Sequence, residues 1–173
     1  MKTVGILLVL ISCSGLGFQM AWRYGQRIEE CVRIGRCLQR LTGEIRFHQL
    51  PLGEALRAAG GSASHDGERF PSLLRRVSVR LEDACGGSFE NLWSQEMGDY
   101  LQDSPLQEEA ELLLYLGQQL GQLDLEEQLK VLYRFLDQWQ EHIRSLKGRQ
   151  EEKGRLYRYL GIFAGCFLAI LLL

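Results

Sequence analysis

Apolar residues recur every three or four positions along most of this 173-residue chain, which is the spacing of one face of an α-helix. The pattern is clearest over residues 31–45, where arginines occupy the other faces and the apolar positions are Cys31, Ile34, Leu38, Leu41 and Ile45. No stretch alternates apolar and polar residues with the two-residue period of a strand. The sequence therefore predicts an all-α fold, a helical bundle of about six helices.

Three short helices are expected after the first one, over residues 52–59, 70–81 and 89–100. Pro51 suits the first turn of the first of them, because proline lacks the amide hydrogen that this turn leaves unbonded. Glycine pairs follow the first helix at Gly60-Gly61 and the second at Gly86-Gly87, and glycine commonly ends a helix.

Two more helices complete the predicted bundle. Ser104-Pro105 predicts the start of the fifth, in which Gln107 completes a capping box and which ends near Gly121. Asp124 is placed to cap the sixth. That helix repeats apolar residues in an unbroken four–three spacing, at Leu125, Leu129, Leu132, Leu136, Trp139, Ile143 and Leu146. This spacing is typical of coiled-coil packing, and we expect the partner to be another helix of the same chain, with a second copy as the alternative.

Both ends of the chain are apolar runs without a charged residue, residues 3–22 and 159–173. About 20 helical residues cover roughly 30 Å, the hydrocarbon thickness of a bilayer, whereas 15 reach only about 22 Å. We expect residues 1–22 to form an N-terminal transmembrane helix, 23–158 a cytoplasmic helical bundle, and 159–173 a C-terminal transmembrane helix. The shorter C-terminal run leaves open whether it crosses completely.

Arginines and lysines flank the bundle side of both runs, which by the positive-inside rule places the bundle in the cytoplasm. An alternative for the N-terminus is a lipoprotein acylated at Cys13, because Leu10-Ile11-Ser12-Cys13 resembles a lipoprotein cleavage box. Simple secretion is a further alternative. The apolar run continues nine residues beyond Cys13 and ends at Trp22 and Arg23 like an interfacial anchor, which favours a retained helix.

Small residues spaced by four lie on one face of each apolar run, at Cys13, Gly17 and Ala21 in the first and at Gly161, Gly165 and Ala169 in the second. Such a face lets two membrane helices approach closely. For antiparallel runs we expect Ala21 to pair with Gly161, Gly17 with Gly165 and Cys13 with Ala169.

Composition and motifs argue against nucleic-acid binding and against catalytic activity. The formal net charge of −2 gives no bulk basicity for nucleic acid. The sequence contains no phosphate-binding loop, HExxH or GxSxG motif, and its five cysteines form no CxxC pair. We expect no catalytic residue, cofactor or metal site, and the cysteines to be reduced structural thiols.

Charge is segregated along the chain. Residues 81–129 hold 12 acidic residues and no lysine or arginine, whereas the remainder holds 20 basic and 10 acidic residues. One interpretation is that acidic and basic helices face each other inside the bundle. The other is an acidic docking surface for a basic partner, where charges would steer association more than tighten it.

Particular residues resemble the stage III sporulation protein AB family of endospore-forming bacteria. The matching features near the N-terminus are Gly17-Phe18, Ala21, Arg27, Leu38, Leu41, Glu44-Ile45, Pro51, Leu52 and Ala55. The segment LGQQLGQLDLEEQ is similar to the family's LGxxLGxxDxxxQ through Leu116, Gly117, Leu120, Gly121, Asp124 and Gln128. The apolar C-terminal run matches the family's closing helix.

This resemblance implies a membrane component of the transport complex between mother cell and forespore, on the mother-cell side in the outer forespore membrane. It implies a bundle similar to the platform protein F of type II secretion and type IV pilus systems. The expected partners are a cytoplasmic ATPase, stage III sporulation protein AA, and other channel proteins. The alternative is a membrane-tethered coiled-coil scaffold that self-associates without an ATPase.

The matched residues are interpreted first as determinants of shape and second as partner contacts. Glu44 and Pro51, with Leu52 and Ala55, frame a turn between two helices. Gly117 and Gly121 permit close packing or a helix stop, Asp124 caps, and Gln128 completes the motif.

Overall fold

The computed structural model describes residues 2–61, 69–83, 88–121 and 123–172, and side chains only within residues 22–150 of these ranges. All regular structure in this part of the chain is helical, which confirms the all-α prediction. The elements are α1 (Lys2–His48), α2 (Leu52–Ala59), α3 (Arg69–Asp83), α4 (Phe89–Gln102), the 3₁₀ helix η1 (Gln107–Glu109), α5 (Ala110–Leu120) and α6 (Leu125–Leu172).

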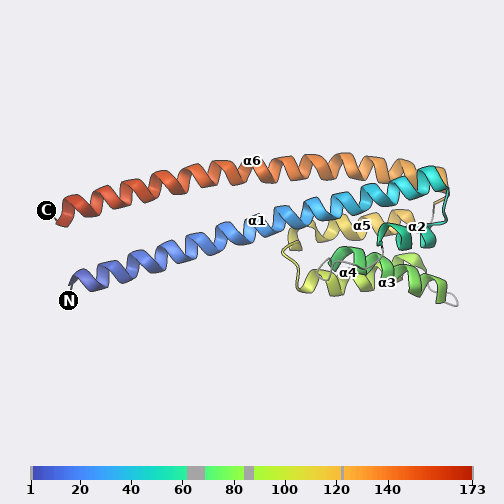
Figure 1. Cartoon of the computed structure of the whole chain (residues 1–173), viewed down its shortest axis with the longest axis horizontal. Coiled ribbons are helices and arrows are strands. Elements are labelled where there is room, and N and C mark those ends of the chain that lie inside the picture. Colours follow the sequence, from blue (N-terminus) through green and yellow to red (C-terminus); the bar gives the residue numbers. More distant parts are fainter. Residues whose placement is uncertain (1, 62–68, 84–87, 122, 173) are drawn as a thin grey trace.

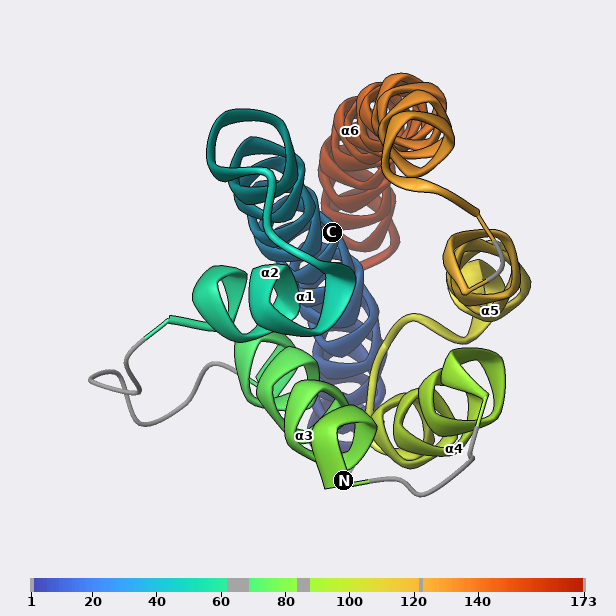
Figure 2. The ribbon, with the colours of Figure 1, turned by 90° about the vertical axis from the view of Figure 1, so that its right-hand side faces the viewer.

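Two long helices give the molecule its shape. α1 and α6, of 47 and 48 residues, run antiparallel side by side, so that both chain termini lie at the same end (Figure 1). The four shorter α-helices pack against the halves of α1 and α6 that lie away from the chain termini. Viewed along the long axis, α2 and α3 lie on one side of the bundle and α4 and α5 on the other (Figure 2).

The core lies where α1 and α6 meet the shorter helices. The apolar face predicted from Cys31 to Ile45 is buried, and Trp139 of α6 packs beside Gly35 of α1. The Trp139 indole also donates a hydrogen bond of 2.8 Å to the Cys31 carbonyl. The four–three face of α6 thus packs against other helices of its own chain, which confirms the expectation of intramolecular packing.

The turn between α2 and α3 shows why glycine stands there. A Cβ at Gly60 would lie 2.8 Å from the Pro71 carbonyl oxygen, and Gly61 adopts a φ of +65°. Only glycine meets both demands without strain. The predicted helix over residues 52–59, ending at this glycine pair, is confirmed.

The predicted start of the fifth helix is wrong. Ser104 and Pro105 lie in a turn, the 3₁₀ helix η1 follows at Gln107, and α5 begins only at Ala110. The N-cap of η1 is Leu106, without a side-chain cap, so the predicted capping box does not form. Leu106 is fully buried, and we attribute the late start to the turn that brings this side chain into the core.

The terminal runs are not separate helices. The boundaries proposed after residues 22 and 158 fall inside α1 and α6, because no proline or cap interrupts either helix there. The side chains of Cys13, Gly17, Ala21, Gly161, Gly165 and Ala169, with their proposed pairing, lie outside the described residues. Within the residues that the structure describes, no helix has the length and apolarity needed to span a bilayer.

Candidate functional site

A buried ionic cluster joins the two long helices to η1. Arg27 of α1 lies on the same face as Cys31 and Ile34, so the helix directs its side chain inward. Its Nε donates to Oε1 of Glu109 at 2.9 Å, and a terminal nitrogen donates to Glu108 at 2.7 Å. From α6, Nε2 of His142 lies 2.7 Å from the same Glu109 oxygen.

The charges in this cluster depend on one another. The Glu109 side chain is 1% exposed and that of Arg27 10%, so each is costly to bury alone. Burial lowers the pKa of Arg27, but its hydrogen bonds to the Glu108 and Glu109 carboxylates outweigh burial and hold the pKa above its ordinary value. Among the described residues, Oε2 of Glu109 has no hydrogen-bond partner. The arrangement contains no activated nucleophile, and its chemical role is to hold three elements together.

A second ionic group connects α3 and α4. Both carboxylate oxygens of Glu96 accept hydrogen bonds, one from Arg76 at 2.7 Å and one from Arg80 at 2.9 Å. Glu96 is buried, which raises its pKa, but the two guanidinium groups outweigh burial and lower the pKa below its ordinary value. This pairing fixes the two helices relative to each other.

The acidic segment, residues 81–129, divides into two groups. One group pairs with arginines from other elements, namely Glu82, Glu96, Asp103, Glu108 and Glu109. The other group has no basic residue within 4 Å in the described part of the chain, and includes Glu90, Asp99, Glu111, Asp124 and Glu127. The internal interpretation of the charge segregation thus holds for the first group, and the second group is left without such a pair on α4, α5 and the start of α6.

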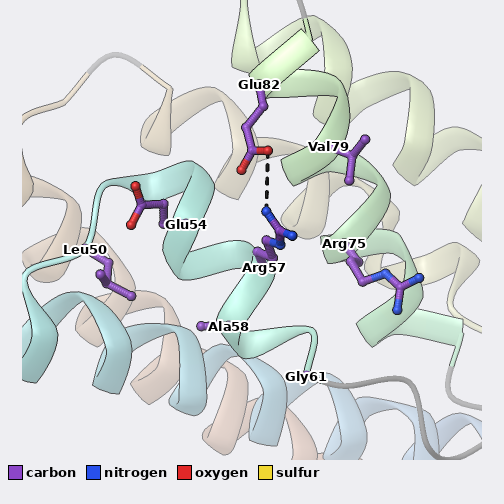
Figure 3. Close-up of a pocket in the computed structure, with 8 residues that line it drawn as sticks. All are labelled: Leu50, Glu54, Arg57, Ala58, Gly61, Arg75, Val79 and Glu82. Carbon is purple, nitrogen blue, oxygen red and sulfur yellow. Dashed lines mark ion pairs between the residues drawn. The ribbon is translucent and has the colours of Figure 1, made fainter.

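An open groove of about 810 Å³ lies between α2 and α3 (Figure 3). Arg57 and Glu82 form a 3.6 Å ion pair across it, and Leu50, Arg75 and Val79 also line it. The described residues that line it include no histidine, cysteine, serine or threonine. Among the described residues, no group of three histidines, cysteines or carboxylates is placed to hold a metal ion.

The motif between α5 and α6 is a packing and capping device. A Cβ on Gly117 would lie 2.0 Å from the Trp93 ring, so glycine is needed for α4 and α5 to approach. Oδ1 of Asp124 accepts a hydrogen bond from the Glu127 amide at 3.0 Å, as expected for a cap. The Gln128 side chain donates to the carbonyls of Leu120 and Leu123.

The remaining motif residues lie around the turn from α1 to α2. Ala55 is fully buried, and its amide donates to the Pro51 carbonyl at 2.9 Å. Leu52 packs partly buried against the core, and Glu44 lies 3.8 Å from His48. A Cβ at Gly121, at the C-terminal end of α5, would lie 3.2 Å from the Phe89 ring. Whether any of these residues contacts a partner stays a prediction.

The sequence did not indicate the Arg27–Glu109–His142 cluster. Its members are 82 and 33 positions apart, so no local pattern connects them. One signal was available: Arg27 continues the apolar face of Cys31 and Ile34 by one turn, where an arginine needs a buried partner.

Comparison with known proteins gives consistent matches. A family model described as stage III sporulation protein AB matches residues 2–173. Stage III sporulation protein AB of Bacillus subtilis (strain 168) is 25% identical over 174 residues, covering 100% of this chain and 99% of the relative. A solved structure of a stage III sporulation protein AB aligns with a TM-score of 0.61 and 20% identity, over 73% of this chain and 98% of that one. At that identity the structural likeness supports the fold alone.

Proposed function

This chain belongs to the stage III sporulation protein AB family, a family of sporulation proteins, and on that premise we propose that it is a non-enzymatic membrane platform of the mother cell–forespore transport complex. In this proposal the bundle lies in the mother-cell cytoplasm and the apolar ends of α1 and α6 insert into the outer forespore membrane. A cytoplasmic ATPase, stage III sporulation protein AA, binds the bundle, and the long helices transmit its movement to the channel.

One observation carries the proposal. α1 and α6 each run unbroken from the core to an apolar terminal run, and both termini lie at the same end of the molecule (Figure 1). Two ends that leave the bundle in the same direction are able to enter one membrane from one side. A continuous helix is also stiff, so a displacement of the bundle is passed along it rather than absorbed by a hinge.

The contacts at the base of the long helices suit such coupling. The Arg27–Glu109–His142 cluster fastens α1 and α6 to η1 at the point where the bundle ends. Beyond Leu146, the last buried apolar side chain that the structure describes in α6, the helix leaves the core. A force applied to α4 or α5 therefore reaches both long helices through η1.

Gly148 offers a test of this coupling with a matched control. It lies in α6 just beyond the core, and a Cβ there would meet nothing within 4 Å. Gly148→Pro breaks the helix at a cost of about 3 kcal/mol, whereas Gly148→Ala favours it. We expect the proline variant to keep membrane association and ATPase co-purification but to lose sporulation, and the alanine variant to sporulate normally.

The outcomes separate the parts of the proposal. Normal sporulation of Gly148→Pro would contradict mechanical transmission through α6. Failure of the unsubstituted full chain to co-purify with the ATPase at low and high salt would contradict the ATPase partnership. A full chain recovered free of membranes would contradict the platform itself.

The coiled-coil scaffold without an ATPase is less well supported. The four–three face of α6 is already occupied by its own chain, as Leu132, Leu136 and Trp139 are buried in the core. Self-association would have to use another surface.

A further inference from the structure

We draw no further inference here: the strongest candidate, the open groove between α2 and α3 with Leu50, Ala58 and Val79 along it (Figure 3), is a surface for which nothing in the structure shows what covers it.

Discussion

At the scale of single residues, the tightest constraint described is the contact between Gly117 and Trp93. Trp93 is 1% exposed, and its indole donates a hydrogen bond of 2.9 Å to the Leu113 carbonyl, so the ring has no room to retreat. A methyl group at Gly117 would have to push α5 away from α4. The close packing of α4 against α5 thus requires that residue 117 has no Cβ atom.

Gly117→Ala is therefore expected to lower the free energy of unfolding by about 1–3 kcal/mol, although alanine favours helix over glycine. Denaturant unfolding measures the change. Gly98→Ala in α4 is the matched control, because a Cβ there meets nothing within 4 Å, and it should raise stability by roughly 0.5–1 kcal/mol. Equal effects at the two glycines would show that the Trp93 contact is unimportant.

Sequence reasoning reached some of these residues and not others. The expectation that Gly117 permits close packing and that Asp124 caps α6 follows from local chemistry, and the structure has both. Trp93 as the partner of Gly117 had no local signal, because the two residues belong to different helices. For Arg27 the sequence indicated only that a buried partner is needed; that Glu109 is this partner depends on how α1, η1 and α6 pack.

At the scale of elements, the ionic group between α3 and α4 makes stability depend on pH. The pKa of Glu96 is lowered in the folded chain because the guanidinium groups of Arg76 and Arg80 outweigh its burial. A lowered pKa stabilises the fold above the unfolded value of about 4.5, and this stabilisation is lost as pH falls through the folded value.

The unsubstituted chain should therefore lose thermal stability as pH falls below about 4.5, and Glu96→Gln should flatten this dependence while lowering stability at neutral pH. Melting temperatures between pH 3 and 7 provide the measurement. Glu90→Gln, on the same helix with no arginine partner among the described residues, serves as control. Parallel pH profiles for the unsubstituted chain and Glu96→Gln would contradict the assignment.

Helix positions were largely predictable because periodicity reports which face is buried. The expected segments over residues 52–59, 70–81 and 89–100 match α2, α3 and α4 closely. The start of α5 was not predictable from Ser104-Pro105, since a buried Leu106 competes with the capping signal. α1 and α6 continue through the changes in composition near residues 22 and 158, because no proline interrupts the helical backbone there.

At the scale of the whole molecule, the Arg27–Glu109–His142 cluster holds together parts that are remote in sequence. Arg27→Met leaves the Glu109 carboxylate buried without its main partner, and should cost about 3–5 kcal/mol of unfolding free energy. Adding Glu109→Gln removes the stranded charge, so the double variant should be more stable than Arg27→Met alone. Thermal unfolding of the full chain measures both. A double variant that is less stable than the single one would contradict a charge-compensating role.

The pairing of the outermost helices also sets the order in which the fold can be completed. The carbonyl of Cys31 accepts its hydrogen bond from the indole of Trp139, which lies 108 positions later in the chain. During synthesis, the face of α1 that α6 buries in the finished fold therefore stays exposed until α6 has been made. Contacts over such a long sequence separation form last. A chain released early, without α6, keeps this apolar surface exposed to proteases and chaperones. An unfinished copy therefore differs from a finished one in the apolar surface that it exposes.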